Sequence, residues 1–357
     1  MNFAVIPWSE AGLKDRIFII DDSRYCADFR NHPYLQMKQE FEKKGDSFHT
    51  IDMYNNLEEI DFFCFFEVDW AWVNKIVKAG YAKKMIYCNA EPPVVNLKNS
   101  PEGYKFWRRF FPYILTWNDA WVDNKIVFKR NIPYYFVECF GDVEFSKRKL
   151  LTSVSGNKQS KHPDELYSER EKVISFFENN YPNDFDFYGT GWENKEHPGY
   201  KGRIEKKSEI YHQYRFALCF ENMKNINGYV TEKILDCLVM GIVPIYAGAD
   251  DIEAYVPKEC FIDYWQFDSL QELADFLQQI EEEDYNKYLE AAKQFLNSEM
   301  ITEFSGARYA EYIYRVAAIN KEFNISMIDK LYIKAVLFKK KIVSKIKAVL
   351  NNSKEKV

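Results

Sequence analysis

Histidine and cysteine, the side chains that most often build metal and redox sites, are few in this sequence and do not cluster. Of 357 residues, five are His and seven are Cys, and no two cysteines form a C-x-x-C motif. The odd, scattered cysteines argue against a disulfide framework and against zinc, and they favour the reduced thiols of a cytoplasmic protein. No histidines have the spacing of a metal site or a catalytic triad.

Long apolar runs are also missing. No stretch of 18 or more apolar residues occurs, and the first residues, MNFAVIPWSEAGLKD, lack the basic segment and apolar core of a secretory signal. We therefore expect neither a membrane-spanning helix nor secretion. The 47% hydrophobic and 17% aromatic content is typical of a globular protein, and the length favours two domains.

Apolar, aromatic stretches alternate with helical patterns up to a basic and polar segment at 141–149, and the alternation then begins again. This arrangement predicts two doubly wound α/β domains, spanning 1–143 and 144–303. In the second domain, LLTSVSGN and FDFYGTGW are predicted strands. The predicted strands of the first domain are FAVIPW, RIFIIDD, SFHTIDMY, IDFFCFFEVD, KMIYCNAE, YILTWND and IPYYF.

The most informative stretch is 215–248, RFALCFENMKNINGYVTEKILDCLVMGIVPIYAG. It predicts a strand, a polar loop, a helix and a second strand, and its polar side chains gather between the first strand and the first helical turn. Free N–H groups and the helix dipole suit an anion there, and Lys233 adds a full positive charge, so a nucleotide diphosphate would fit. The alternative is that Thr231 caps the helix, Glu232 complements the dipole and Lys233 is solvated.

The segments CFEN, GYVTEKILD and GIVPIYAG resemble the donor-binding signature of glycosyltransferase family 10, the α1,3/4-fucosyltransferases. The resemblance implies a GT-B architecture, in which two Rossmann-like domains face one another across a cleft, and GDP-fucose as donor. It also implies an arginine on the diphosphate; Arg203 is the best match and Arg215 the rival. The donor-binding residues implied are Arg203, Glu221, Asn222, Tyr229, Thr231, Glu232 and Lys233.

Glu91 is the candidate catalytic residue. It follows a predicted strand in YCNAEPPVV, and the two prolines after it stiffen the backbone. Taken alone, the residue is better explained as a strand-terminal Glu that caps a turn. The family resemblance makes Glu91 the general base that takes the proton of an acceptor hydroxyl, with inversion at C1 of the sugar.

The acceptor has no motif of its own. Trp117 and Trp121, in TWNDAW, are candidates for stacking on a sugar ring, with a role in the core as the alternative. By resemblance the acceptor is a glycan or glycolipid containing galactose or N-acetylglucosamine, in lipopolysaccharide or other surface glycan synthesis. A transferase for another GDP-deoxysugar and a non-catalytic nucleotide-sugar binding protein remain alternatives.

We expect no required cofactor and no dedicated metal site, although Mn²⁺ or Mg²⁺ could stimulate the reaction. The single D-x-D motif, Asp184 to Asp186, enters a predicted strand, and so short a motif often arises by chance. Cationic side chains would neutralise the diphosphate in place of a metal.

The C-terminal region is helical and strongly basic at its end. Residues 304–320 are our candidate for a helix that crosses back to the first domain. Residues 321–357 contain ten Lys and three acidic residues, a net charge of +7 in a chain whose total is −6.

The tail is predicted to be an amphipathic helix that binds anionic lipid, with a dimerising or core-packed helix as the alternative. Nucleic acid is a poorer partner, since the rest of the chain is acidic. We therefore expect a cytoplasmic enzyme of the bacterial branch, bound peripherally to the inner face of the membrane. The apolar residues that recur at helical spacing are Ile328, Leu331, Ala335, Phe338, Ile342, Ile346 and Val349.

Overall fold

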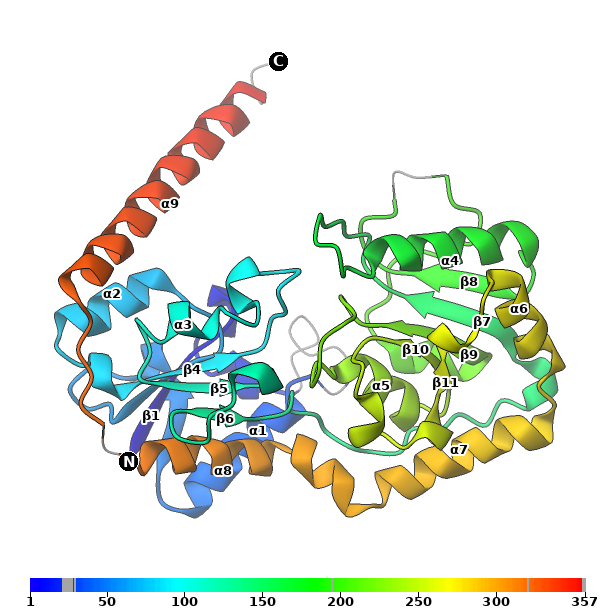
Figure 1. Ribbon diagram of the computed structural model, residues 1–357, viewed down its shortest axis with the longest axis horizontal. Coiled ribbons are helices and arrows are strands. Elements are labelled where there is room, and N and C mark those ends of the chain that lie inside the picture. The colour runs from blue at the N-terminus through cyan, green and yellow to red at the C-terminus, as the bar shows by residue number, and fades with distance from the viewer. Residues whose placement is uncertain (21–27, 29, 194–195, 320, 355–357) are drawn as a thin grey trace.

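The computed structural model describes residues 1–20, 28, 30–193, 196–319 and 321–354, and contains two lobes, each built on a parallel β-sheet (Figure 1). The first sheet has six strands in the order β2-β1-β3-β4-β5-β6. Most of its central strand residues are buried, because helices cover both faces, which explains their nearly continuous apolar sequence. The strands are β1 (Asn2–Ile6), β2 (Ser47–Thr50), β3 (Phe62–Phe65), β4 (Met85–Asn89), β5 (Tyr113–Thr116) and β6 (Val127–Lys129).

Two predicted strands of the first lobe are absent from this sheet. Residues Arg16–Phe18 of RIFIIDD form a 3-10 turn, and Asp21 and Asp22 lie outside the described residues. The segment IPYYF is extended but pairs with no strand in the described structure, because it runs along the second lobe. There Tyr134 donates a hydrogen bond to Phe304 O and its hydroxyl donates to Asp236. β6 takes the edge position instead.

The second sheet has five parallel strands in the order β11-β10-β9-β7-β8. Its strands are β7 (Lys149–Val154), β8 (Phe185–Tyr188), β9 (Tyr214–Phe220), β10 (Val243–Ala247) and β11 (Ile262–Asp263). The helices around it are α4 (Tyr167–Asn180), α5 (Glu232–Val239), α6 (Leu270–Gln279) and α7 (Glu282–Leu296).

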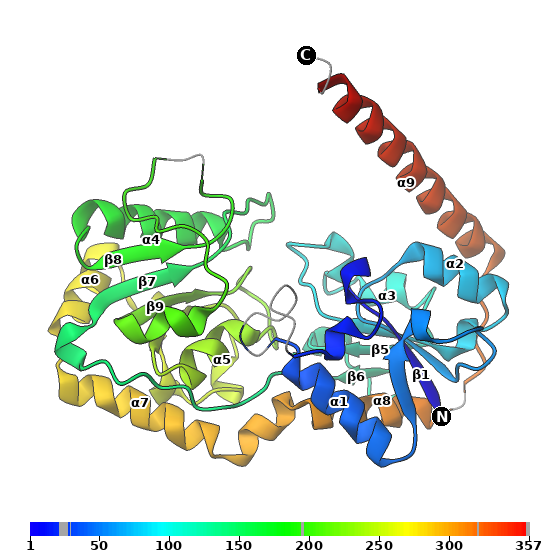
Figure 2. The same ribbon diagram turned by 180° about the vertical axis from the view of Figure 1, so that it is seen from behind.

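The chain returns to the first lobe through α8 (Gly306–Ala317), which packs along α1 (His32–Lys43) (Figure 2). Tyr309, Ile313 and Val316 of α8 belong to the same apolar core as the first sheet. Gly306 allows the close approach of the two helices, because a Cβ atom there would lie 2.0 Å from Pro33 O. The other helices of this lobe are α2 (Trp70–Lys78) and α3 (Tyr104–Trp107).

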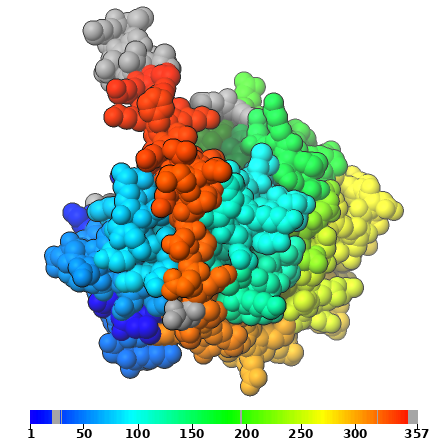
Figure 3. All heavy atoms as spheres, turned by 60° about the vertical axis from the view of Figure 1, so that its left-hand side comes forward, coloured from blue at the N-terminus to red at the C-terminus, as the bar shows by residue number. Residues whose placement is uncertain are grey.

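The last helix, α9 (Met327–Lys354), begins on the first lobe and then projects away from it (Figures 1 and 3). Its first turns are fixed by an ion pair between Asp329 and Arg109 and by the Tyr332 ring, which packs on Trp70 and Phe110. No helix among the described residues combines the length and apolar character needed to span a membrane.

Candidate active site

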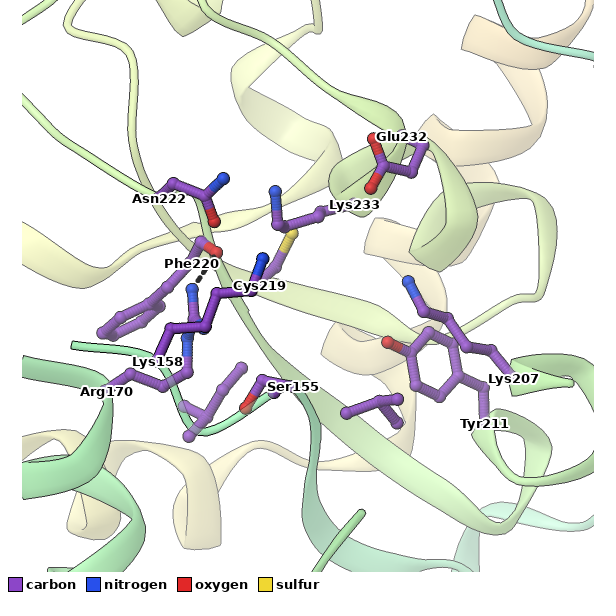
Figure 4. A pocket seen from close by; sticks show the side chains of 13 residues that line it. Ser155, Lys158, Arg170, Lys207, Tyr211, Cys219, Phe220, Asn222, Glu232 and Lys233 are labelled. Carbon is purple, nitrogen blue, oxygen red and sulfur yellow. Dashed lines mark hydrogen bonds between the residues drawn. The ribbon is translucent and has the colours of Figure 1, made fainter. Parts of the chain in front are cut away.

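A cavity of about 170 Å³ lies at the carboxyl edge of the second sheet, beside the start of α5 (Figure 4). Four cationic side chains and a single carboxylate line it, so its charge favours an anion. The lining residues are Val154, Ser155, Gly156, Lys158, Arg170, Lys207, Tyr211, Leu218, Cys219, Phe220, Asn222, Glu232 and Lys233. This is where open α/β sheets bind ligands, beyond the carboxyl ends of their strands.

Glu221 fixes the loop between β9 and α5. Its carboxylate is fully buried and accepts hydrogen bonds from Thr231 N at 2.8 Å, from Thr231 Oγ1 and from Lys233 Nζ at 2.8 Å. Thr231 is the N-cap of α5, and its Oγ1 accepts from Lys233 N. The end of the strand and the start of the helix are thereby joined through one carboxylate.

Two lysines of the cavity are held by buried acids. Burial lowers the pKa of Lys233, but Glu221 and Glu232 outweigh burial and raise it. Lys207 Nζ lies 2.7 Å from Asp236 Oδ2, whose other oxygen accepts from the Tyr134 hydroxyl at 2.6 Å. Burial opposes the charge of Lys207 as well, yet Asp236 raises its pKa well above the usual value. Both lysines therefore stay charged at neutral pH.

The remaining cations come from the other side of the cavity. Arg170 of α4 is buried and donates to the carbonyls of Phe220 at 2.8 Å and Glu221 at 3.1 Å. Lys158 follows β7 in the segment SVSGNK, and Figure 4 shows its ammonium group directed into the cavity from the side opposite Lys207. Figure 4 also shows Lys158, Lys233 and Lys207 around one central space.

Glu232, the first residue of α5, is the only carboxylate of the cavity lining. Desolvation in the crevice raises its pKa, but the charges of Lys233 and Lys207 outweigh this and lower it. Glu232 is therefore ionised at neutral pH and can accept hydrogen bonds from hydroxyl groups. The arrangement suits a ligand that carries both phosphates and sugar hydroxyls.

Across the gap, Glu91 lies two residues beyond the end of β4, and its loop is held by three side-chain donors. Arg130 donates to Asn89 O, Trp117 Nε1 to Ala90 O at 2.9 Å, and Asn99 Nδ2 to Glu91 O at 2.7 Å. Three consecutive carbonyls are thus fixed, while the Glu91 carboxylate makes no hydrogen bond or ion pair with the described residues. A rigid backbone with a free carboxylate is what a general base needs.

Burial and the nearby carboxylate of Glu67 raise the pKa of Glu91, while Lys158 and Lys233 lower it. These two lysines line the cavity of the second lobe, so the Glu91 carboxylate lies close enough to that cavity for its charges to act on it. A raised pKa makes Glu91 a stronger base than an ordinary surface carboxylate, provided that it is ionised.

The structure corrects the prediction that Trp117 and Trp121 stack on an acceptor. Trp117 is 0% exposed and Trp121 2% exposed, so neither ring offers a face to a sugar. Trp117 instead packs against Tyr229 of the second lobe, with ring centroids 4.8 Å apart, while its indole N–H holds the Glu91 loop. Trp121 donates to Ser100 O in the core of the first lobe.

The predicted donor residues separate into three groups. Asn222, Glu232 and Lys233 line the cavity. Glu221, Tyr229 and Thr231 are buried and do not line it; they fix the loop and the contact between the lobes. Gly228 in this loop has φ +78°, and a Cβ atom there would lie 2.4 Å from Trp117 O, so only glycine fits.

The structure does not bring Arg203 to the cavity: its side chain is exposed and is not among the lining residues. The rival Arg215 also points elsewhere, with its guanidinium 3.9 Å from the Phe145 ring centroid. The cations that the sequence interpretation missed are Lys158, Arg170 and Lys207. Only Lys158 carried a signal, since it directly follows the small-residue segment SVSGN.

The D-x-D motif is not arranged for a metal ion. Asp184 is exposed before β8, whereas Asp186 is buried and paired with Lys149 at 2.6 Å and with Lys201 at 3.2 Å. Within the described residues, no group of three or more His, Cys, Asp or Glu side chains is placed to hold a metal.

Two solved glycosyltransferases share this two-lobed arrangement. A solved α1,3-fucosyltransferase matches 91% of this chain and 92% of its own, with a TM-score of 0.55 and 14% identity. A solved β-glucosyltransferase that modifies DNA matches 89% of this chain and 100% of its own, with a TM-score of 0.52 and 12% identity. The fold is therefore GT-B, with two Rossmann-like domains.

Residues 145–322 match the family model described as glycosyltransferase family 10 (fucosyltransferase), C-terminal part. The chain is 39% identical over 77 residues to an α-(1,4)-fucosyltransferase of Arabidopsis thaliana and 35% identical over 74 residues to the α-(1,3)-fucosyltransferase FucT of Helicobacter pylori. These matches cover 21% of this chain, but only 19% and 15% of those relatives. The chain belongs to glycosyltransferase family 10.

Proposed function

We propose that the protein is an inverting fucosyltransferase that moves L-fucose from GDP-β-L-fucose to a hydroxyl of a glycan. The observation that carries this proposal is the placement of Glu91, a half-buried carboxylate with a raised pKa, opposite a cavity lined by four cations. The family membership supports it. So does a solved structure of the same fold, an α1,3-fucosyltransferase with GDP-fucose, which matches with a TM-score of 0.53 and 15% identity.

The donor would bind with its diphosphate among Lys158, Lys207 and Lys233, near the first N–H groups of α5. Glu232 would accept hydrogen bonds from the ribose hydroxyls. As the bond between C1 of fucose and the β-phosphate oxygen breaks, negative charge grows on that phosphate. Three ammonium groups, two of them held by buried acids, stabilise this charge most in the transition state.

In the chemical step the acceptor hydroxyl attacks C1 from the face opposite the diphosphate. Its proton passes to the Glu91 carboxylate, the new C1–O bond forms, and GDP leaves with the electron pair of the old bond. One displacement without a protein nucleophile inverts the configuration at C1. No required metal enters this scheme, although added Mn²⁺ or Mg²⁺ could still stimulate turnover by binding the released GDP.

The proposed acceptor contains galactose or N-acetylglucosamine, as in lipopolysaccharide or another surface glycan. The test measures GDP release from GDP-fucose with a panel of β-galactosides and N-acetyllactosamine, using the wild type and Glu91→Gln. We expect the variant to keep its GDP affinity and to lose transfer by several orders of magnitude. Equal turnover in the two proteins would rule out Glu91 as the base.

Two alternative functions have distinct results in the same assay. A transferase for another GDP-deoxysugar would release GDP faster from that donor than from GDP-fucose. A non-catalytic binding protein would bind GDP-fucose and release nothing, with or without Glu91.

We further propose that α9 binds the inner face of an anionic membrane and places a cytoplasmic enzyme near a lipid-linked acceptor. Its first turns pack on the first lobe through Tyr332 and Ile333, but another face of the helix stays apolar and exposed. The side chains of Ile328, Leu331 and Phe338 are 73%, 58% and 67% exposed. Lysines are interspersed among these apolar residues along the helix, and each contributes about 1 kcal/mol to binding near an anionic surface.

Flotation with vesicles of phosphatidylcholine, with and without phosphatidylglycerol, tests the membrane proposal. The wild type should bind only the anionic vesicles, and salt should weaken the binding. Phe338→Asp should abolish it, while the control Ser344→Asp on the same exposed part of the helix should weaken it only slightly. A concentration-dependent dimer without vesicle binding would support the alternative, a helix that pairs with a second copy.

A further inference from the structure

A second half-buried carboxylate lies beside Glu91 at the edge of the first sheet. Strands β3 and β4 are parallel neighbours with Phe65 opposite Tyr87, and Glu67 and Glu91 each lie two residues beyond the end of their strand. Among carboxylates, Glu67 raises the pKa of Glu91 more than Glu232 of the other lobe does. Two carboxylates therefore occupy equivalent positions at one edge of the first sheet, and the charge of one acts on the other.

One of the two carboxylate oxygens of Glu67 lacks a hydrogen-bond partner among the described residues. Its Oε1 accepts a hydrogen bond from Val68 N at 2.9 Å, and its other oxygen has no hydrogen bond or ion pair with the described residues. Half-buried carboxylates are usually paired, because burial of a lone charge is unfavourable. Two such groups at one edge of the sheet indicate a ligand that supplies several hydrogen-bond donors, and sugar hydroxyls are donors of this kind.

A cluster of aromatic rings around Phe66 fixes the backbone next to Glu67. Phe66, the preceding residue, is 6% exposed and packs among the rings of Trp8, Tyr34 and Tyr309, with centroids 5.5 to 6.3 Å away. This cluster joins the ends of β1 and β3 to α1 and α8. The carboxylate after it is therefore presented to the gap by a packed core, as a binding residue should be.

We propose that Glu67 binds the acceptor sugar, accepting a hydrogen bond from a hydroxyl next to the one whose oxygen attacks C1. This inference rests on the proposed function, because it takes Glu91 as the base for an acceptor in the gap. Glu67 makes no bond to the transferred sugar and takes no proton. It sets which pair of neighbouring hydroxyls is held, so it is a specificity-determining residue.

The pair also affects the pH at which the base works. The groups that act on Glu91 are Glu67 on its own lobe and Lys158, Glu232 and Lys233 on the other, and Tyr167 and Tyr229 lie nearby. Removing the negative charge of Glu67 stabilises ionised Glu91, so the pKa of Glu91 falls. Activity that requires ionised Glu91 then persists to lower pH.

The test compares Glu67→Ala and Glu67→Gln with the wild type in transfer from GDP-fucose to N-acetyllactosamine. Glu59→Gln is the matched control, since Glu59 is exposed at the opposite end of β3. We expect Glu67→Ala to raise the acceptor KM about tenfold or more, from the loss of a charged hydrogen bond, with the KM for GDP-fucose unchanged. In Glu67→Gln, the acid limb of the pH profile should move to lower pH, a shift that a purely structural role would not produce.

The inference is overturned if both variants keep the acceptor KM and the acid limb of the wild type. It is also overturned if Glu67→Gln abolishes transfer as completely as Glu91→Gln, because Glu67 would then be the base. Failure of the proposed function is a separate result: the wild type would transfer no fucose. In that case, the effect of the Glu67 charge on the pKa of Glu91 is tested by titrating ¹³C-labelled glutamate carboxyls. The Glu91→Gln variant assigns the Glu91 signal. An unchanged pKa of Glu91 in Glu67→Gln would refute this effect.

Discussion

The two edges that face the gap differ in how their charges are used. At the edge of the second sheet, Glu221 and Asp236 are buried and bound to Thr231, Lys233 and Lys207. At the edge of the first sheet, Glu67 and Glu91 are half-buried and lack ion pairs within the described chain. One edge is therefore complete as it stands, whereas the other has acceptor capacity that a ligand must fill.

The difference shows what each edge requires of its ligand. A diphosphate has high charge, so a cavity that binds one needs cations held in place before binding. At this edge, buried acids hold two of the four cations, Lys207 and Lys233. A neutral sugar has only hydroxyl dipoles to offer, so its site needs free acceptors on a rigid backbone. The pairing on one side and its absence on the other thus agree with a charged donor and a neutral acceptor.

The largest expected effect on stability comes from removing the charge of Glu221, which joins the end of β9 to the start of α5. Glu221→Gln leaves Lys233 without its counter-charge and the loop 222–230 without its main anchor. Loss of one partner of a buried ion pair costs about 3–5 kcal/mol, and because Lys233 keeps 24% of its side chain exposed we expect about 2–3 kcal/mol here. Denaturant unfolding measures this loss, and GDP affinity should fall with it.

The control for Glu221 is the double variant Glu221→Gln/Lys233→Met. It removes both charges, so most of the lost stability should return, because no unpaired charge is left buried. GDP binding should stay weak, since a cation of the cavity is gone. If the double variant binds GDP as tightly as the wild type, Lys233 does not contact the diphosphate.

A smaller effect is expected at the edge of the first sheet, from the Trp117 indole, which holds the loop of the proposed base Glu91. Trp117→Phe keeps an aromatic ring against Tyr229 but removes the N–H that binds Ala90 O. A lost hydrogen bond costs about 1 kcal/mol, and a looser Glu91 loop should lower kcat by about five- to tenfold with GDP affinity unchanged. Trp121→Phe removes the same kind of bond, to Ser100 O, and should leave kcat close to the wild-type value.

The sequence predicted the edge of the second sheet, where the acids are paired, better than the edge of the first sheet, where Glu67 and Glu91 lack ion pairs within the described chain. The reason is physical. Glu221, Thr231 and Lys233 lie within one strand-loop-helix unit, so the local motif already contains their mutual geometry. Lys158 and Lys207 come from separate loops that the sheet order brings together, and nothing in their local sequence indicates it. Glu67 was missed for the same reason, since its position beside Glu91 depends on β3 lying next to β4.

Burial was the other quantity that the sequence could not supply. Trp117 and Trp121 follow β5 among polar residues, where exposed and buried rings give the same pattern. Their burial depends on distant parts of the chain: Trp117 packs against Tyr229 of the second lobe, and Trp121 lies in the core of the first lobe. Similarly, IPYYF has the composition of a strand, but Tyr134 is buried against Asp236 of the other lobe without joining a sheet. Most of the other predicted strands were found, because apolar runs that are covered on both faces are a strong signal.

The smallest expected effect is at Arg203. It tests whether the cations that bind GDP are those that line the cavity or the arginine that the family resemblance implies. Arg203→Met changes an exposed side chain outside the cavity, so GDP affinity should change by less than twofold. Lys207→Met removes a cation from the cavity itself and should weaken GDP binding about tenfold, which is what one charged hydrogen bond contributes. Calorimetry with GDP measures both. A large loss in Arg203→Met would mean that the loop around Arg203 closes over the bound nucleotide, and the paired edge would then be incomplete without its ligand.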